Sequence, residues 1–279
     1  MTSEIQEAAL QMIRAGLSVF PVKAKNSPGP WEEFMGRIIT EEEVPKRFNG
    51  SKLCAVVGGA VSGNLIDLDI DDPDTREPLL AMIKAKHPDI QNRLVFTKTP
   101  NGYGILFRSE SLVIGNHKIA KAHLKVDGPG PHSWKDRPSK YQGVQKKDDP
   151  SGDFFITPTK LETKGERGYF LVHPSPGYEI LQGSIEDLKP IPDQDVTSIL
   201  AIARLFHEIP GDLAKGMHET TKIEKKTKLV IDYPGTVYAK QVDCSEILKD
   251  HGWVKVGRVK NGTTWGRPGA PDKRIGGTL

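Results

Sequence analysis

Three aspartates alternate with aliphatic residues in one short segment, and this pattern constrains the fold more than any other feature. Residues 64–71 read Asn-Leu-Ile-Asp-Leu-Asp-Ile-Asp. Side chains of a strand point alternately to the two faces of its sheet. Asp67, Asp69 and Asp71 would therefore share one face, while Leu68 and Ile70 enter the core. The segment predicts a strand with one acidic and one apolar face.

Spacing alone leaves two interpretations of the acidic face open. Aspartate is a poor strand former and neighbouring like charges repel, so a bound divalent cation would offset a real cost. Carboxylate oxygens suit Mg²⁺ or Mn²⁺. The alternative is a solvated edge strand that ends in the acidic turn Asp71-Asp72-Pro73-Asp74.

Helix and strand periodicities flank this segment on both sides. Ser3 and Gln6 have the spacing of a capping box, and Gly16 is a natural helix stop. Pro100-Asn101-Gly102 predicts a tight hairpin between two strands. The predicted helices are 3–16, a start at 40, 78–87 and 193–208, and the predicted strands are 17–22, 54–57, 94–99, 103–108 and 168–172.

Residues 109–159 form a long insertion that is poor in apolar residues, with short strands expected near 122–126 and 154–156. Its basic residues have two interpretations: a solvated face, or a track for a phosphate backbone with Trp134 and Tyr141 as base-stacking platforms. Three histidines in it have no cysteines nearby and no spacing typical of zinc ligands. The basic residues are Lys118, Lys121, Lys125, Lys135, Arg137, Lys140, Lys146 and Lys147.

Composition narrows the class of protein. The chain has 279 residues, 37% hydrophobic and 27% charged, with a net charge of +3, which is enough apolar residues for a packed core. The two cysteines exclude a disulfide framework and indicate a reducing compartment. Because no segment approaches the roughly 20 apolar residues of a membrane span, and no leader is seen, we expect a cytoplasmic protein without membrane contact. No Walker-type loop and no nucleophilic Ser/His/Asp set is recognisable.

The composition also suggests three parts. Residues 1–208 are expected to form the main domain, 209–236 a polar, Lys-rich linker, and 237–279 a small C-terminal unit. Because the sequence stops without a closing helix, this unit is expected to begin a truncated downstream region.

Four segments, taken in order, resemble one family: the bifunctional DNA primase/polymerase (prim-pol) domain of phage and plasmid replication proteins, in the archaeo-eukaryotic primase superfamily. The resemblance spans roughly residues 5–207. It implies an α+β fold in which an RRM-like catalytic sheet is fronted by an N-terminal α/β unit. The four segments are 8–21, 61–71, 99–107 and 161–175.

The resemblance also implies site residues. The metal-binding acids would be Asp69, Asp71 and Glu162, with Asp67 as the alternative if the register is shifted. They would hold two divalent cations, Mg²⁺ or Mn²⁺, and nucleoside triphosphates would be the substrates. Lys164 and Arg167 would neutralise the triphosphate or meet the template backbone.

One position departs from the family pattern. The second motif, Thr99 to Phe107, has Gly104 where the family has a histidine that contacts the phosphates of the incoming nucleotide. Either the chain is an inactivated version, or another group in this nucleotide-binding region, such as Arg108 or a lysine of the insertion, serves the phosphates.

The implied function is DNA-templated nucleotidyl transfer, that is, primer synthesis and extension by a DNA primase and DNA-directed polymerase in phage or plasmid replication. Single-stranded DNA would be the template, with Lys140, Lys146 and Lys147 as nucleic-acid contacts. The segment 265–269 resembles one that follows this domain in primase–helicase chains, which implies a helicase or ATPase domain further on. Two other classes remain: a non-catalytic single-stranded nucleic-acid-binding module and a metal-dependent nuclease.

Overall fold

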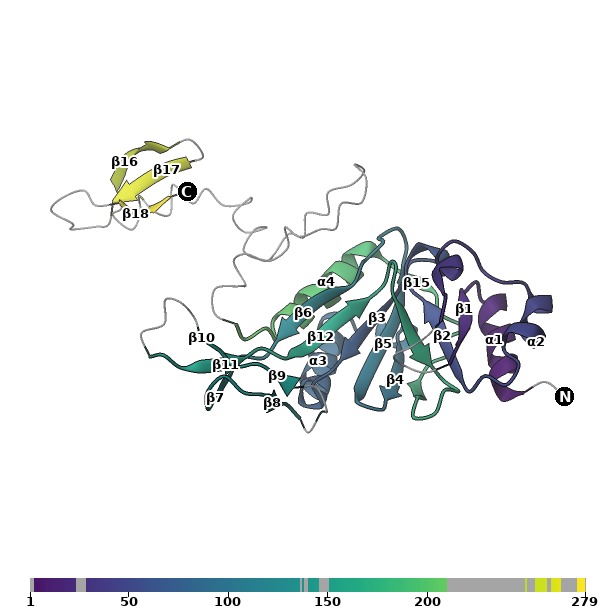
Figure 1. The fold of residues 1–279 in the computed structure, drawn as a ribbon. Coiled ribbons are helices and arrows are strands. Elements are labelled where there is room, and N and C mark those ends of the chain that lie inside the picture. Colours follow the sequence, from purple (N-terminus) through teal and green to yellow (C-terminus); the bar gives the residue numbers. More distant parts are fainter. Residues whose placement is uncertain are drawn as a thin grey trace. The chain divides into compact units, whose positions relative to one another are not determined.

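The computed structural model describes residues 3–23, 29–135, 137, 140–145, 151–209 and 249, together with the backbone of three strands within 254–278 (Figure 1). The chain divides into two compact units, residues 1–223 and 224–279. Each unit is described by itself below.

The first unit is a mixed α+β domain built on a large central sheet. Its strands run in the order β14-β4-β5-β3-β12-β6, all neighbours on this path being antiparallel, and the short β15 pairs in parallel with the end of β5. The predicted hairpin forms between β4 and β5, and the predicted acidic strand is β3, at the centre of the sheet. The bounds are β3 Leu65–Ile70, β4 Val95–Thr99, β5 Gly102–Ser109, β6 His117–Lys121, β12 Thr159–Lys164, β14 Glu179–Gln182 and β15 Pro190–Ile191.

Two helices, α3 (Pro73–Lys86) and α4 (Asp193–Arg204), pack on one face of this sheet (Figure 1). Leu68 and Ile70 of β3 are at most 1% exposed in the core that these helices complete. Alternation along β3 therefore turns the aspartates to the opposite face, as predicted. Burying the apolar side chains contributes about 1.5–3 kcal/mol each to folding, which fixes this register.

Helix α3 begins earlier than the sequence predicts, so the predicted start at Pro78 is wrong. Asp72 is the N-cap: its carboxylate accepts hydrogen bonds from the backbone N–H of Asp74 at 3.3 Å and from the Thr75 hydroxyl at 2.9 Å. Pro73 occupies the first turn, where its missing N–H costs nothing. The acidic segment 71–74 is thus a helix start rather than a solvated turn.

A histidine fastens α3 to α4. His87, the C-cap of α3, contacts the Ser198 hydroxyl through Nε2 at 2.7 Å and Asp195 Oδ1 through Nδ1 at 3.1 Å. No local sequence pattern predicts this Ser/His/Asp set. Ser198 lies within α4, where the helix itself uses its backbone N–H, so this N–H is not free to stabilise an oxyanion as in an acyl-transfer site. We interpret it as an interhelical fastening.

The predicted N-terminal α/β unit is present. Helix α1 (Glu4–Arg14) has the predicted Ser3/Gln6 capping box and ends before Gly16, whose φ of +75° stops it. It packs on a three-stranded antiparallel sheet, β1 (Val19–Val22), β2 (Leu53–Val57) and β13 (Tyr169–Val172). Because β13 follows β12 closely in the chain, the two sheets are joined at that point.

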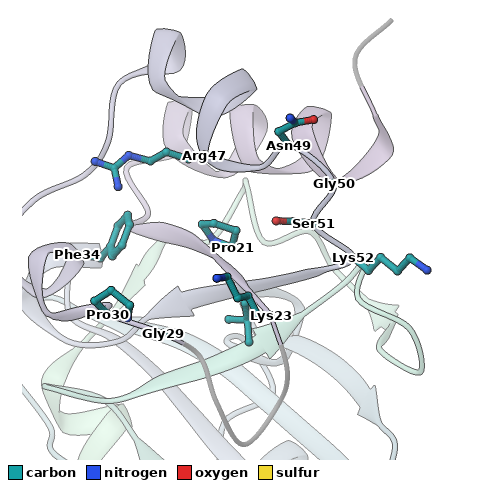
Figure 2. A pocket seen from close by; sticks show the side chains of 11 residues that line it. Pro21, Lys23, Gly29, Pro30, Phe34, Arg47, Asn49, Gly50, Ser51 and Lys52 are labelled. Atoms are coloured by element: carbon teal, nitrogen blue, oxygen red, sulfur yellow. The ribbon is translucent and has the colours of Figure 1, made fainter.

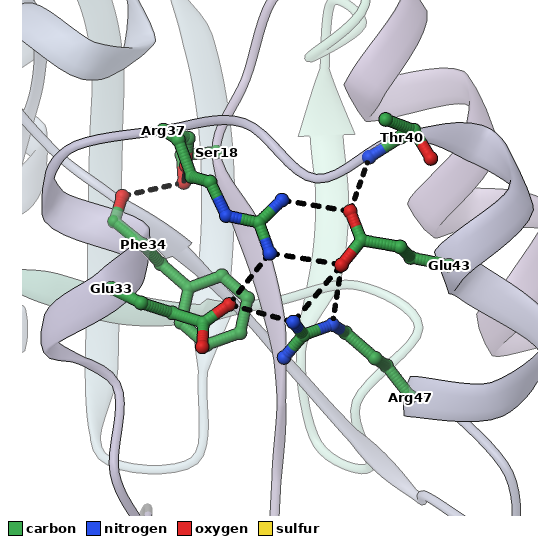
Figure 3. Close-up of polar contacts among 7 residues, drawn as sticks. All are labelled: Ser18, Glu33, Phe34, Arg37, Thr40, Glu43 and Arg47. Carbon is green, nitrogen blue, oxygen red and sulfur yellow. Dashed lines mark hydrogen bonds and ion pairs between the residues drawn. The ribbon is translucent and has the colours of Figure 1, made fainter.

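An ion-pair cluster holds the segment 31–47 together, and the Ser18 hydroxyl, next to β1, donates to the Phe34 carbonyl of this segment at 2.7 Å (Figure 3). Arg37 pairs with Glu33 at 2.9 Å and with Glu43 at 2.7 Å, and Arg47 contacts the same two carboxylates at 2.7 and 2.9 Å. The pKa of Glu43 lies well below its usual range, chiefly because its carboxylate accepts a hydrogen bond from Arg37. This segment contains η1 (Glu32–Met35), η2 (Glu41–Glu43) and α2 (Val44–Arg47).

A hollow of about 630 Å³ opens next to this cluster (Figure 2). Lys23, Arg47 and Lys52 are its charged lining residues, and Arg47 is already paired with Glu33 and Glu43. The hollow lies beside the small N-terminal sheet, whereas the acidic strand belongs to the central sheet.

The insertion is shorter than predicted, because its expected first part is strand β6 of the central sheet. The remainder has its own small core, in which Trp134 is 6% exposed and packs with Ala122 and Ile156. Trp134 is therefore a core residue, and the interpretation of it as a base-stacking platform is wrong. Lys146 and Lys147 lie outside the described residues. The short strands are β7 Leu124–Val126, β8 His132–Ser133, β9 Lys140–Tyr141, β10 Val144–Gln145 and β11 Phe154–Ile156.

In the second unit, β16 (Val254–Val259), β17 (Gly262–Gly266) and β18 (Ile275–Thr278) form an antiparallel sheet. The predicted linker 209–236 lies outside the described residues apart from Ile209. Among the residues that the structure describes, no helix combines the length and the apolar character of a membrane span.

Candidate metal and nucleotide site

The acidic face of β3 meets two other strands in a single row. Asp69 lies directly opposite Gly104 of β5 on one side and Glu162 of β12 on the other. Residues opposite one another in an antiparallel pair have Cβ atoms about 4.5–5.5 Å apart. The strand pairing itself therefore brings the carboxylates of Asp69 and Glu162 together.

The structure brings together the three acids that the resemblance indicated. Asp69, Asp71 and Glu162 each offer one carboxylate oxygen, and these oxygens lie within 4.8 Å of one another. Their side chains are 15%, 22% and 24% exposed, so a ligand can still reach them. Three hard oxygen donors at this spacing fit a divalent cation that prefers oxygen ligands.

Asp67 belongs to the same face but not to this group of three. It is 6% exposed, and its Oδ1 has no hydrogen-bond partner among the described residues. Burial first, and the charge of Asp69 second, raise the pKa of Asp67 well above its usual value. A buried carboxyl oxygen without a hydrogen-bond partner is costly. A cation bound to the neighbouring carboxylates would offset the repulsion that they exert on Asp67. The residues present therefore fit a divalent cation.

Lys164 supplies positive charge inside the group. Its Nζ lies 2.5 Å from Asp69 Oδ2 and 3.3 Å from Glu162 Oε1. Burial disfavours its charge, but Asp69 and the neighbouring carboxylates outweigh burial and raise the pKa of Lys164. For Glu162, burial and the charges of Asp69 and Asp71 together raise the pKa.

Arg137 of the insertion is a site residue that the sequence did not single out. Its Nη1 lies 2.5 Å from Asp71 Oδ1, and its Nη2 donates to the backbone carbonyls of Asp71 and, at 2.7 Å, of Asn101. Its guanidinium also lies over the Trp134 ring, 5.5 Å from the centroid. The sequence signal was only one basic residue among many, distant along the chain from Asp71.

Two tyrosines are electrostatically coupled to the acids: Tyr178, which the sequence did not single out, and Tyr141, which it indicated only as a base-stacking platform. Burial, and then the charge of Asp71, raise the pKa of Tyr141. Burial, and then the charge of Asp69, raise the pKa of Tyr178. The two phenols therefore stand close enough to the carboxylates to sense their charge, Tyr141 from β9 and Tyr178 from the segment before β14.

Gly104 has a packing reason to be glycine here. A Cβ at this position would lie 2.7 Å from Thr97 Oγ1 and 2.8 Å from Asp67 Oδ1, both closer than real Cβ contacts allow. A histidine at this position would therefore displace both neighbours. The space that a side chain at position 104 would need is occupied by Thr97 and Asp67.

The other predicted nucleotide-binding residues are not brought to the acids. Arg108 lies at the far end of β5, where Nη2 donates to the backbone carbonyls of Ala15 at 2.8 Å and of Gly16 at 3.4 Å. It ties β5 to the end of α1, at the opposite end of β5 from Gly104's hairpin. Arg167 lies in the exposed turn after β12, with φ of +57°. Lys140, the one predicted nucleic-acid contact within the described residues, is exposed on β9.

Fold and site together define an α+β domain whose central antiparallel sheet carries a candidate divalent-cation site of two aspartates and a glutamate. The family model of the bifunctional DNA primase/polymerase, N-terminal domain matches residues 9–194, which is two thirds of the chain, and the chain belongs to this family. The match ends within α4 and includes all three acids, Lys164 and Arg137. Among curated proteins, none matches the chain.

Proposed function

We propose that this chain carries out DNA-templated nucleotidyl transfer: primer synthesis and extension from nucleoside triphosphates on a single-stranded DNA template, in phage or plasmid replication. The observation that carries the proposal is the convergence of Asp69, Asp71 and Glu162 on one open face of the sheet. Membership in the primase/polymerase family supports this class of reaction.

In this proposal the three carboxylates hold two divalent cations, Mg²⁺ or Mn²⁺. Bound divalent cations would activate an attacking 3′-hydroxyl and stabilise the charge of the reacting phosphate. Asp69 and Asp71 share strand β3 and its end, and Glu162 is fixed opposite Asp69 by the strand pairing, so all three are held on rigid backbone. Rigid backbone keeps the three carboxylates in position for the cations.

Lys164 has the position to neutralise charge on the substrate. Its ammonium already lies between Asp69 and Glu162, and the raised pKa keeps it protonated at any physiological pH. We assign Arg167, in the exposed turn that follows, to the template backbone, since its side chain faces solvent rather than the acids. A downstream helicase or ATPase domain in a longer chain is part of the same proposal and rests on the resemblance of residues 265–269 alone.

Primer synthesis tests this function. The protein is incubated with single-stranded DNA, nucleoside triphosphates and Mn²⁺ or Mg²⁺, and labelled products are resolved by length. We expect short primers from the native sequence and none from Asp69→Asn. Glu179→Gln is the matched control, because Glu179 is an exposed acid on the edge strand β14 that pairs with Lys98. Shortening of the template without new product would instead identify the metal-dependent nuclease.

A second candidate function has one observation in its favour. Gly104 offers no side chain to a phosphate and is packed so that none fits without displacement. A non-catalytic single-stranded nucleic-acid-binding module would bind DNA in the same buffer and make no primer with any nucleotide or metal. Retained DNA binding together with absent synthesis would decide for this module.

A further inference from the structure

Resting on the proposed function, we propose that Arg137, carried by the insertion, binds the phosphates of the incoming nucleoside triphosphate in place of the histidine that is missing at position 104. The insertion would then contribute a residue to the nucleotide site.

The guanidinium of Arg137 is fixed at the acidic group by contacts that do not depend on the carboxylates. Backbone carbonyls of Asp71 and Asn101 accept hydrogen bonds from Nη2, and the Trp134 ring packs against the guanidinium. Asn101 belongs to the β4–β5 hairpin, so Arg137 touches the second motif as well as the end of β3. Its side chain is 15% exposed, which leaves it reachable from solvent.

The guanidinium of Arg137 offsets part of the negative charge of the acids. Asp69, Asp71 and Glu162 converge with the buried Asp67 behind them. In the described part of the chain, the cations in ion-pair contact with the three converging acids are Lys164 and Arg137. An arginine presents a planar fork of donors that matches phosphate oxygens in a bidentate manner, which a lysine cannot do.

The ion pair with Asp71 leaves one donor of Arg137 unused by the contacts described above. Those contacts involve Nη1 and Nη2, whereas the Nε–H group takes part in none of them. The β8–β9 hairpin is held at this end of β3 by two contacts, Arg137 with Asp71 and Lys135 with Asp72 at 3.2 Å.

The alternatives for the phosphates are weaker. Gly104 has no side chain, and Arg108 is committed to the carbonyls at the end of α1. Among the insertion's lysines, Lys135 pairs with Asp72 at 3.2 Å and with Asp74, beside the acidic group rather than in it. Lys135 also anchors the hairpin independently of Arg137, so a change at Arg137 leaves the hairpin one of its anchors.

Equilibrium binding tests the proposal without requiring catalysis. The probes are deoxyadenosine triphosphate and deoxyadenosine monophosphate with Mn²⁺, measured by calorimetry on the native chain, Arg137→Ala, Arg137→Lys and the control Lys135→Ala. Removal of a charge-assisted bidentate interaction is expected to weaken triphosphate binding tenfold or more in Arg137→Ala. We expect a smaller effect in Arg137→Lys, little change in monophosphate binding, and near-native triphosphate binding in Lys135→Ala.

Titration with Mn²⁺ alone, and thermal unfolding of each variant, separate this role from a structural one. Mn²⁺ binding should be unchanged or tighter in Arg137→Ala, because a cation that competes for Asp71 is gone. Equal weakening of mono- and triphosphate binding, unchanged triphosphate binding, or no triphosphate binding by the native chain would each overturn the proposal. Arg137-dependent triphosphate binding without primer synthesis would leave this inference standing while the proposed function fails.

Discussion

Glu162 lies directly opposite Asp69 across the antiparallel pair of β12 and β3. Two acids that are distant in sequence thus become neighbours through backbone hydrogen bonding alone, and Asp71 joins them from the end of β3. The strand register, rather than a loop conformation, determines the geometry of the candidate metal site.

Removing one acid should therefore weaken cation binding without disturbing the fold. We expect Glu162→Gln to reduce Mn²⁺ affinity at least tenfold, because one anionic oxygen of three is removed while the side-chain shape is kept. Calorimetric titration with Mn²⁺ measures the effect, and Glu179→Gln is the control. Unchanged Mn²⁺ affinity in Glu162→Gln would show that the cation binds elsewhere.

Gly104 should resist even a methyl group. The added Cβ of Gly104→Ala would overlap Thr97 Oγ1 and Asp67 Oδ1, and overpacking of this kind costs about 1–3 kcal/mol. Chemical denaturation measures the destabilisation. Gly36→Ala is the matched control, since its Cβ would meet only the Glu33 carbonyl oxygen, at 3.9 Å. A Gly104→Ala variant as stable as the native chain would reopen this position to a histidine.

Much of the fold could be predicted because local chemistry determines it. The Ser3/Gln6 capping box, the Pro100–Gly102 hairpin and the alternation in β3 each depend on residues close in sequence, and each is present. The start of α3 was missed because Asp72 reads equally well as part of an acidic turn. Only the hydrogen bonds that it accepts from Asp74 and Thr75 distinguish a helix cap.

The acidic residues of the site could be predicted from the sequence, but the basic side chain of Arg137 could not. Asp69, Asp71 and Glu162 lie in segments whose order resembles a known family, whereas Arg137 comes from an insertion whose basic residues look alike in sequence. Arg108 was favoured for its place after the second motif, but the packing of α1 against β5 engages it. Such long-range choices depend on tertiary interactions that no local pattern reports.

The His87 fastening predicts a measurable coupling between α3 and α4. We expect His87→Ala to destabilise the domain by about 1–2 kcal/mol, since it removes hydrogen bonds to Ser198 and Asp195. A double-mutant cycle with Ser198→Ala should give a smaller destabilisation than the two single variants together. Strict additivity would show that the two side chains do not interact in solution.

Asp193 predicts a pH-dependent contribution to stability. Burial alone would raise its pKa, but hydrogen bonds from Ser109, Ser111 and the Leu112 backbone bring the pKa down to about 2. Because the folded pKa is lower than the unfolded one, the stabilisation is complete above the unfolded value of about 3.9 and is lost as the pH falls toward 2. The carboxylate oxygen Oδ1 accepts from the Ser109 hydroxyl at 2.5 Å and from the Ser111 backbone at 2.9 Å.

Asp193→Asn should accordingly lower Tm at pH 7, with a destabilisation of about 1–2 kcal/mol for weakened charge-assisted hydrogen bonds. The difference from the native chain should shrink between pH 4 and pH 2. Thermal unfolding across this range measures it, with the exposed Asp187→Asn as control. A Tm difference that stays constant with pH would rule out the charge of Asp193 as its source.

The basic residues of the insertion make the last prediction, because the proposed function needs a single-stranded template. If Lys140, Lys146 and Lys147 bind phosphates, replacing all three with glutamine should weaken binding to every sequence alike. The logarithm of the affinity should also fall less steeply with the logarithm of salt, by about 0.7 for each phosphate that is no longer neutralised, so by about 2 in all. Fluorescence anisotropy with labelled oligothymidine and a mixed-sequence strand measures both slopes.

The control replaces Lys84 and Lys86, exposed lysines of α3, which packs on the opposite face of the sheet from the acids. If the control changes the slope as much as the insertion variant does, DNA does not bind preferentially at the insertion, and its lysines form a solvated face. A shallower slope confined to the insertion variant would show that the template contacts these lysines.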